Sequence, residues 1–591
     1  MPPNNGTHGL WLGAIVLLST TLSAMGRVIL NTNTNVTSLA SNVAQCTKAD
    51  KTDFWGADIA RLANVASFQN CCNRCFKNQN CDRWSYAADT KRCWLKRSSG
   101  WTRKENTKRV SGRVIRTSIG SPSPSPAANG AAPVPTTPKT SPIPSDGSFS
   151  KSNYADVLGL SWRFYEAQRS GKLPANNRIS WRKSSHTKDV VPGGWYDAGD
   201  YLKLNFPLAS VVSFLSWGLL EFKAGYQQAG ETQHALDNLY TAADYLKRCH
   251  IAPRKYIGQI GHPDIDHAFW GRSDQQKTAR PAYVYDATMG ASDLMGKVAA
   301  ALASSALVWR PVNATFSADL LTHAKDLYQW GTEKDGKYSS YYVSATASIY
   351  ASSDSDDDMA WGAYWLYRAT NDRNYLEDAV KYWKKKYWDV TAGWDNSGAA
   401  VAVALANLVE DGESVPSGAE IKDWVVNNFL ESWTKPNGSI RSTPKGMRHP
   451  SWSKWGNLQL STTASFLAIT HAKHSNSAAV KKKALQFARS QVDYAMGSSG
   501  RSFVVGYGTN PPLRAHHAGA SCPNRPAKCD WTHFQSTKPN PQILYGALVA
   551  GPEGPGDDTY RDKRDDYVSN EVSVGYNSGF TSALAGLVEL V

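Results

Sequence analysis

Long apolar segments, alternating strand patterns and nucleic-acid-binding motifs are all scarce in this chain. Only residues 10–22 (LWLGAIVLLSTTL) stand out as an apolar run, and this run is too short for a comfortable membrane span. No later run is long enough to stop transfer, so we expect no stable membrane span. The net charge of +15 is spread along the chain without a nucleic-acid motif. We therefore expect no nucleic-acid partner, and a nucleic-acid binder remains an alternative on charge alone.

The apolar run is typical of the core of a signal peptide. The small residues Ser23 and Ala24 follow it. This predicts a signal peptide over residues 1–25 and a secreted, extracellular protein. The positive charge that usually precedes such a core is missing from MPPNNGTHG, so an uncleaved anchor at residues 10–24 is the alternative. Glycosylation sequons at Asn35, Asn313 and Asn437 agree with secretion.

Tryptophan and tyrosine are abundant relative to phenylalanine. The 591-residue chain holds 22 Trp and 27 Tyr against 16 Phe. Trp and Tyr combine a flat apolar face with a polar atom, which suits wet recognition surfaces such as carbohydrate clefts. The length exceeds one ordinary domain and predicts several folded parts with a large core.

Six of the nine cysteines are crowded into one short stretch, at Cys46, Cys71, Cys72, Cys75, Cys81 and Cys93. A dense, even cluster behind a signal peptide predicts a disulfide framework, whose pairing the spacing leaves open. Zinc is the alternative. The adjacent Cys71 and Cys72 and the lack of nearby histidines argue against it.

The run CCNRCFKNQNCDRWSYAADTKRCWLK resembles the PAN/apple family over about residues 54–114. The resemblance implies a small disulfide-rich α+β module at residues 40–116, in which a cysteine-bearing helix is stapled to a sheet. It also implies a module that binds cell-wall carbohydrate or protein and has no catalytic role. Residues 117–150 then become rich in Pro, Ser, Thr, Ala and Gly, which predicts an extended linker.

Helical periodicity dominates residues 151–591. The predicted helices cover residues 154–169, 207–225, 231–249, 292–309, 317–330, 357–370, 374–386, 397–409, 419–433, 461–472, 477–496 and 573–590. A large, mostly helical domain with long loops indicates helical hairpins arranged as a ring, with the loops at one end carrying function. Periodicity alone does not require the ring to close.

The stretch GGWYDAGDYLKLNFPLA, residues 193–209, holds two carboxylates three residues apart, Asp197 and Asp200. Its glycines allow unusual backbone conformations, and Trp195 is one of several aromatic side chains on which sugar rings can stack. The stretch runs directly into a predicted helix, which predicts that the two acids are held in place. A solvated turn is the alternative for this stretch alone.

Other loops carry histidines, aromatics and acids. His267 and Trp270 share the segment GQIGHPDIDHAFW, and His516 lies in a Gly/Asn/Pro-rich loop. Cys522 and Cys529 follow that loop, and a local disulfide is favoured over zinc because the spacing fits no common zinc pattern.

A charged run, YRDKRDDYVSNEVSVGYN, precedes the last predicted helix. It contains Asp562 and Glu571. Because charged runs are usually exposed to solvent, a solvated face without a function is the alternative interpretation of this segment taken alone.

Several of these segments occur together in one family. GGWYDAGDYLK, DHAFW, WGAYWLYRAT, WDN, QVDYAMG, SFVVGYGTNPP followed by HH, and DKRDDYVSNEVSVGYN resemble glycoside hydrolase family 9, the inverting β-1,4-glucanases. The motifs run in family order across nearly all of residues 152–591. The resemblance implies an (α/α)6 barrel at residues 151–591, an open cleft for cellulose-like chains and endo-1,4-β-glucanase (cellulase) activity.

The resemblance also assigns roles to residues. Asp200 is similar to the general base, Asp197 to its partner in holding water, and Glu571 to the general acid, with Asp562 in a supporting position. The positions that contact sugar in the family correspond to His516, His267, Trp270 and Tyr576. Inversion needs one carboxylate to activate water and one carboxylic acid to protonate the leaving oxygen, so no cofactor is required for the chemistry.

Three departures from the family pattern bear on function. Ala518 stands where the family has an arginine, and Gln459 stands where it often has another. The acidic run SSDSDDDMAW differs from the family's calcium-binding segment. The liganding positions are retained as Asp357, Asp358 and Asp395, so a structural calcium and a solvated acidic turn are both open. The alternative function is a cell-wall carbohydrate-binding protein whose hydrolase domain has weakened activity.

Overall fold

The computed structural model describes residues 45–46, 49–55, 58–77, 81, 83–97, 102–115, 138, 140–142, 148–385, 389–435 and 438–591. The predicted signal peptide, the sequons at Asn35 and Asn437, and most of the predicted linker lie outside these residues. Within the described ranges, no helix combines the length and the apolar character needed to cross a membrane. The chain divides into two compact units between residues 132 and 133.

The first unit is a small antiparallel sheet with one helix. Its strands are β1 (Gln45–Cys46), β2 (Ala49–Trp55), β3 (Asp58–Leu62), β4 (Arg83–Ala87), β5 (Arg92–Lys96) and β6 (Thr102–Ile115), in the order β1-β6-β4-β5-β3 with β2 also paired to β6. Helix α1 (Phe68–Lys77) is joined to β5 by the Cys71–Cys93 disulfide, and Cys75 pairs with Cys81. The predicted stapled helix on a sheet is confirmed.

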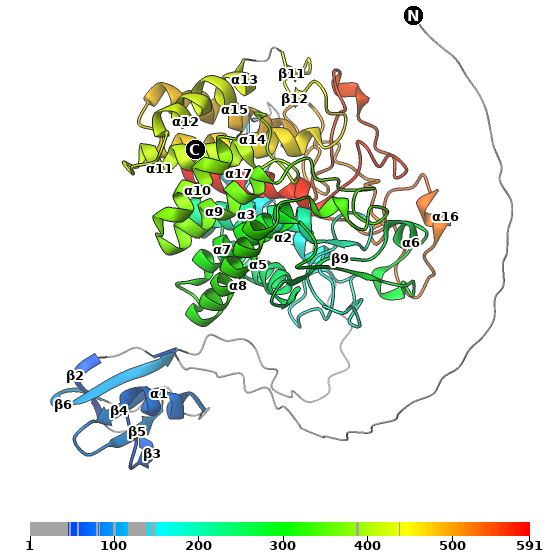
Figure 1. Ribbon diagram of the computed structural model, residues 1–591. Coiled ribbons are helices and arrows are strands. Elements are labelled where there is room, and N and C mark those ends of the chain that lie inside the picture. The colour runs from blue at the N-terminus through cyan, green and yellow to red at the C-terminus, as the bar shows by residue number, and fades with distance from the viewer. Residues whose placement is uncertain are drawn as a thin grey trace, which may run out of the picture. The chain divides into compact units, whose positions relative to one another are not determined.

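The second unit consists mainly of helices (Figure 1). Its longer helices are α2 (Lys151–Ala167), α3 (Asn205–Glu221), α5 (Thr232–Arg248), α7 (Ser292–Trp309), α8 (Ala314–Glu333), α9 (Asp356–Thr370), α10 (Arg373–Trp383), α11 (Gly398–Glu410), α12 (Gly418–Trp424), α14 (Asn457–His474), α15 (Ala478–Met496) and α17 (Val574–Leu590). The shorter helices are α4 (Lys223–Gln228), α6 (Pro263–His267), α13 (Glu431–Thr434) and α16 (Trp531–Phe534).

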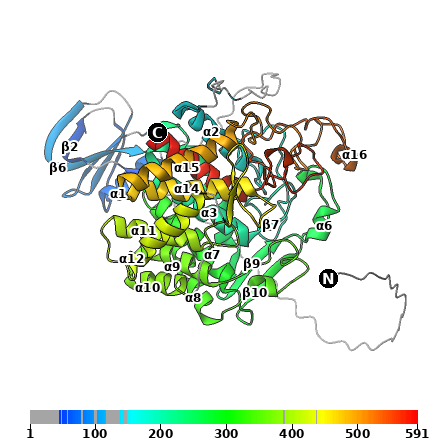
Figure 2. The ribbon, with the colours of Figure 1, turned by 90° about the horizontal axis from the view of Figure 1, so that it is seen from above.

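Six of these helices form a closed inner ring in the order α3, α7, α9, α11, α14 and α17, with α17 packed against α3. The other six long helices pack outside them, each preceding or following an inner helix in the chain (Figure 2). The inner helices are buried on nearly all sides, whereas outer helices such as α5 bury only one face. The predicted (α/α)6 barrel is therefore confirmed, including the closure that periodicity left open.

A small sheet in this unit escaped the sequence analysis. Strands β7 (Lys203–Leu204), β8 (His250–Ala252) and β10 (Ala282–Asp286) all pair with β9 (Lys255–Ile260). β7 and β8 are too short to show a pattern, and β9 is buried at nearly every position, so its residues do not alternate between apolar and polar. Strand β7 connects the Asp197–Asp200 stretch to α3, and β9 leads to α6, so the pairing brings these two loops together. A further hairpin joins β11 (Ile440–Ser442) and β12 (Arg448–Pro450).

Part of the predicted linker belongs to the barrel. The backbone N–H of Ser141 donates to Asp156 at 2.5 Å, and the side chain of Asn153 donates to the carbonyl of Pro142 at 3.1 Å. Ser150 caps α2 by accepting a hydrogen bond from the backbone of Asn153. The end of the proline-rich segment is thus held against α2.

Candidate active site

A cleft of about 680 Å³ opens where the chain enters the inner helices. Its walls come from the segments before α3, α7, α9, α11, α14 and α17, and they hold Asp197, Asp200, Tyr350, Trp394 and Glu571, among others. In a closed ring of hairpins, the starts of all inner helices lie at one end. Residues nearly four hundred positions apart in the chain therefore line one cavity.

Asp200 lies at the floor of this cleft, next to His267. Its Oδ2 lies 2.9 Å from His267 Nε2, and its Oδ1 accepts a hydrogen bond from the backbone of Leu202 at 3.3 Å. The hydrogen bond to the Asp200 carboxylate raises the pKa of His267. The side chain of Asp200 stays 22% exposed, so water reaches its carboxylate.

Asp197 is more deeply buried than Asp200. Its Oδ2 accepts a hydrogen bond from the Tyr350 hydroxyl at 2.7 Å, while its Oδ1 has no partner in the described chain. Burial raises the pKa of Asp197 to about 7, the charge of Asp200 adds to the rise, and the tyrosine bond opposes it. A buried carboxylate oxygen without a partner is costly unless something binds there, and Asp197 is one of the residues that line the cleft.

Glu571 comes from the opposite end of the sequence. Burial, together with the charges of Asp200 and Asp197, raises its pKa to about 8. The indole N–H of Trp455 lies 3.4 Å from Glu571 Oε2. The carboxyl group therefore keeps its proton to a higher pH than an ordinary glutamate does, and it can give up this proton inside the cleft.

The predicted sugar-contacting residues lie around these acids. His267, Trp270, His516 and Tyr576 all line the cleft. His516 Nδ1 donates to the carbonyl of Arg564 at 2.6 Å, and burial lowers its pKa, so the ring is neutral. Trp270 packs edge-on against His516, with ring centroids 5.3 Å apart.

Asp562 supports the loop that carries His516. Its carboxylate accepts hydrogen bonds from the backbone N–H groups of Leu513 and Arg514 at 3.0 and 2.9 Å. The loop that carries Asp197 and Asp200 contacts the same segment, because the backbone N–H of Ala518 donates a hydrogen bond to the carbonyl of Gly199 at 2.8 Å. A Cβ at position 199 would lie 2.3 Å from the His516 carbonyl, so this close approach requires glycine.

The prediction that Trp195 binds substrate is wrong. This side chain is 1% exposed, does not line the cleft, and packs in the core against Tyr165 with ring centroids 4.8 Å apart. A β-bridge between Arg169 and Trp195 turns the ring inward. The aromatic residues beside glycines predicted a surface for stacking sugar rings. The sequence does not show this backbone pairing, so it could not show that the Trp195 ring packs in the core.

Sequence reasoning missed several cleft residues, of which Tyr350 makes the most direct contact. Further aromatic side chains of the cleft are Trp394, Trp455 and Tyr567 in separate loops and Trp531 at the start of α16. Trp455 is 48% exposed and Tyr567 54% exposed, with ring centroids 5.8 Å apart. Isolated aromatics in long loops carry no spacing signal, although the surplus of Trp and Tyr indicated that such a surface exists.

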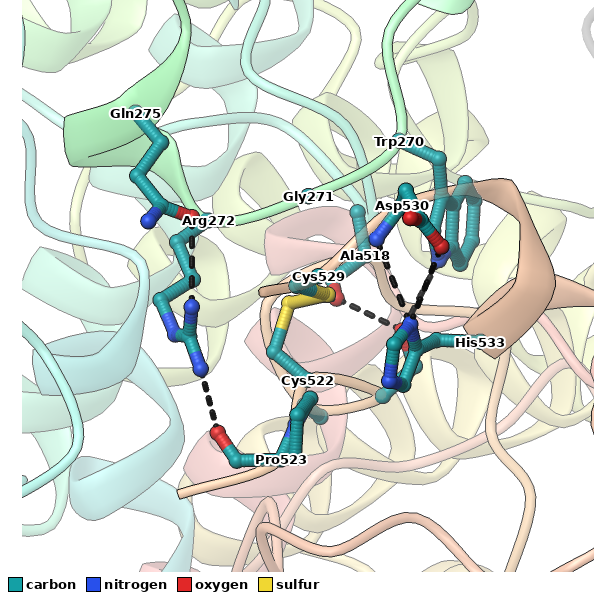
Figure 3. The surroundings of a disulfide bond; sticks show 12 residues. Trp270, Gly271, Arg272, Gln275, Ala518, Cys522, Pro523, Cys529, Asp530 and His533 are labelled. Atoms are coloured by element: carbon teal, nitrogen blue, oxygen red, sulfur yellow. Dashed lines mark hydrogen bonds and ion pairs between the residues drawn. A yellow bond between two sulfur atoms is a disulfide. The ribbon is translucent and has the colours of Figure 1, made fainter. Parts of the chain in front are cut away.

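A disulfide loop precedes the short helix α16, which reaches the cleft, and Figure 3 shows the surroundings of this disulfide. Cys522 and Cys529 are bonded, and the guanidinium of Arg272 donates to the carbonyls of Pro523 and Ala527 at 2.5 and 3.0 Å. The following helix α16 places Trp531 5.8 Å from Trp270 between ring centroids. Figures 1 and 2 show α6 and α16 on the same side of this unit.

Ala518 and Gln459 stand where the family resemblance implies arginines, so the cleft lacks these two cationic side chains. Both residues line the cleft, and none of its described lining residues is lysine or arginine.

The predicted calcium ligands do not form a metal site in the described chain. No three His, Cys, Asp or Glu side chains there are placed to hold an ion. Instead, Asp358 is paired with Lys297, and Asp395 accepts a hydrogen bond from the backbone of Ser353 at 2.8 Å. Calcium prefers six to eight oxygen ligands, and this arrangement does not fit it.

Comparisons with known proteins agree with the fold. A family model for glycosyl hydrolase family 9 matches residues 154–584, and one for the PAN domain matches residues 52–96. Endoglucanase B of Cellulomonas fimi is 38% identical over 457 residues, which are 74% of this chain and 42% of that protein. The chain therefore spans less than half the length of that relative.

Solved structures give the same result. The endoglucanase of the termite Nasutitermes takasagoensis is 41% identical with a TM-score of 0.69, covering 74% of this chain and 99% of that one. Endoglucanase CelQ of Clostridium thermocellum, solved with cellotetraose, is 34% identical with a TM-score of 0.65, covering 74% of this chain and 71% of that one.

Proposed function

The chain belongs to glycosyl hydrolase family 9, and from this premise we propose that it is an endo-1,4-β-glucanase that cleaves cellulose or a related β-glucan with inversion at the anomeric carbon. The observation that carries the proposal is the difference between the acids that line one cleft. Glu571 has its pKa raised to about 8, whereas Asp200 is partly exposed and bonded to a histidine. One acid is thus suited to give a proton and the other to take one.

The proposed reaction is a single displacement. Asp200 removes a proton from water, whose oxygen attacks the anomeric carbon of the β-linked sugar from the face opposite the leaving group. Glu571 gives its proton to the glycosidic oxygen as the carbon–oxygen bond breaks. The products are a new reducing end in the α configuration and a free hydroxyl on the other fragment, and no cofactor takes part.

Asp197 is proposed to hold the water together with Asp200. Its unpartnered Oδ1 is the oxygen available for this contact, because Oδ2 is bonded to Tyr350. His267 fixes the orientation of Asp200 through the bond to Oδ2. The exposed rings of Trp455 and Tyr567 provide flat faces along which a glucan chain can lie.

A substrate panel tests the function directly. The purified protein is expected to release reducing sugar from carboxymethylcellulose, and comparison with mixed-linkage glucan, xyloglucan and chitosan defines the preferred polymer. Binding to these polymers without release of reducing sugar would instead favour the alternative, a weakened carbohydrate-binding protein, since Ala518 and Gln459 remove two expected cationic contacts.

Tyr350→Phe is expected to slow hydrolysis about tenfold or more, because one hydrogen bond to a charged group is worth about 1.5–3 kcal/mol. The Tyr350 bond lowers the pKa of Asp197. Its loss should therefore raise that pKa and move the acidic limb of the pH–rate profile to higher pH. Tyr341→Phe, on the same loop, is the control, since its hydroxyl bonds the backbone of Gly290 and not an acid. An unchanged acidic limb in Tyr350→Phe would contradict the role of Asp197.

The two units are proposed to be modules joined by the proline-rich segment, with the signal peptide directing secretion. The barrel alone should hydrolyse soluble glucan at a rate similar to that of the whole chain. Fragments 138–591 and 151–591 should be compared, because residues 141 and 142 bond to the first barrel helix. If both fragments were inactive while the whole chain worked, the modular proposal would fail.

The small module is proposed to bind insoluble cell-wall carbohydrate or a wall protein. Residues 40–116 should be retained on cellulose better than an unrelated protein of similar size. Equal retention would remove cellulose as its ligand and leave a wall protein to be sought.

A further inference from the structure

Lys297 is buried where the family resemblance predicts calcium. It lies on α7, its side chain is fully buried, and its Nζ is 2.7 Å from Asp358 Oδ1, whose side chain is also fully buried. Asp358 belongs to the first turn of α9. A buried lysine is rare because removing its charge from water is costly, so its position needs an explanation.

The local backbone is built to bring this lysine to the acids. Helices α7 and α9 touch at glycines, since a Cβ at Gly296 would lie 2.7 Å from the backbone of Asp358. A Cβ at Gly362 would lie 2.7 Å from the carbonyl of Gly296. Because the two helices cross so closely, Lys297, the residue after Gly296 on α7, lies next to the start of α9.

The ammonium group makes two further contacts that suit a cation. It donates a hydrogen bond to the carbonyl oxygen of Trp394, and it lies 4.4 Å from the centroid of the Phe206 ring. The adjacent Asp357 accepts the backbone N–H of Ser397 at 2.6 Å. One cation thus connects α7, the start of α9 and the turn that leads into α11.

These contacts support the wall of the cleft. The Trp394 ring lines the cleft and packs edge-on against Tyr350, with centroids 4.7 Å apart. Tyr350 in turn donates its hydroxyl to Asp197. Two buried carboxylate oxygens, Asp357 Oδ1 and Asp358 Oδ2, have no partner in the described chain. The acids therefore retain the oxygens that a metal ion would use.

We propose that the side chain of Lys297 is the structural cation of this site, and that it takes the place of a bound calcium ion in holding the cleft wall. The fold then needs no metal, because the positive charge is part of the chain. Removal of this charge leaves buried carboxylates without compensation and opens space in which calcium can bind.

The test compares melting temperatures in excess calcium and in excess chelator, a readout that does not depend on hydrolysis. The native protein is expected to melt at the same temperature in both. Lys297→Met removes the charge at similar size and should lower the melting temperature by about 3–5 °C, as expected for an uncompensated buried charge in a domain of this size. Lys297→Ser should melt low in chelator and recover part of the loss in calcium, with calcium found in the purified variant.

Lys385→Met is the matched control. Lys385 pairs at 2.6 Å with Asp356, which lies in the same first turn of α9 as Asp358. The side chain of Lys385 is 44% exposed, so this change should shift the melting temperature by only about 1 °C. Two results would overturn the proposal, namely a native protein that loses stability in chelator and regains it in calcium, or a Lys297→Met protein as stable as the control. If both Lys297 variants fail to fold, the native protein decides, since calcium independence supports the proposal and calcium dependence refutes it.

Discussion

Glu571→Gln is expected to lose activity on cellulose by about 10²–10⁴-fold, the usual contribution of a general acid, while losing far less on aryl β-cellobiosides. The leaving oxygen of a polymer needs a proton, whereas a nitrophenolate departs without one. Glutamine keeps the size of the side chain and cannot give up a proton, so the comparison isolates the proton transfer. Initial rates on both substrates measure the effect.

The pH dependence gives a second test of the same residue. Burial, Asp200 and Asp197 raise the pKa of Glu571 to about 8, so its proton is present below that pH and is lost above it. Activity on polymer should therefore fall as pH rises through about 8. On aryl substrates this alkaline limb should be much smaller in the native protein, because the leaving group departs without that proton.

The control for this variant is Glu420→Gln. Glu420 is 59% exposed and pairs with Lys384 at 2.9 Å, and neither residue lines the cleft. It should leave both rates unchanged. Equal losses on polymer and aryl substrate for Glu571→Gln would mean that Glu571 acts through the architecture of the cleft and not by giving a proton.

The two acidic segments could be identified from the sequence because each combines charge with glycines and aromatics next to a strong helical pattern. Helical periodicity is a local property of the sequence, so it could not show that these two segments lie side by side in the fold. It follows from ring closure, since α17 packs against α3 and the acids precede these helices in the chain. The resemblance to a family supplied the closure that periodicity left open.

The cleft residues that were missed share a physical cause. Tyr350 and Trp455 act through single contacts to Asp197 and Glu571 from loops with no repeating pattern. The calcium prediction depended on the acids alone and did not consider Lys297, which lies about sixty positions earlier within an apolar helix. A charged residue inside such a helix is a sequence signal, because it must find an opposite charge in the core.

Asp200→Asn is expected to lose about 10²–10⁴-fold on polymer and on aryl substrate alike, because water must be activated whatever group leaves. This pattern differs from that of Glu571→Gln, and the difference between the two variants assigns base and acid. Asparagine keeps the shape and a hydrogen bond to His267, so the fold should be preserved. Asp264→Asn is the control, since that side chain is 89% exposed and lies close in sequence to His267.

Azide distinguishes a lost base from a distorted cleft. An azide ion attacks the anomeric carbon without giving up a proton, so it should restore turnover of aryl substrate by Asp200→Asn and form an α-glycosyl azide while the aryl group leaves. The native enzyme should give a product whose first reducing end is α by NMR, and the two carboxyl groups should be about 6.5–9.5 Å apart to leave room for water. A first product in the β configuration would contradict inversion, and failure of azide to restore turnover would indicate that Asp200 shapes the cleft and does not activate water.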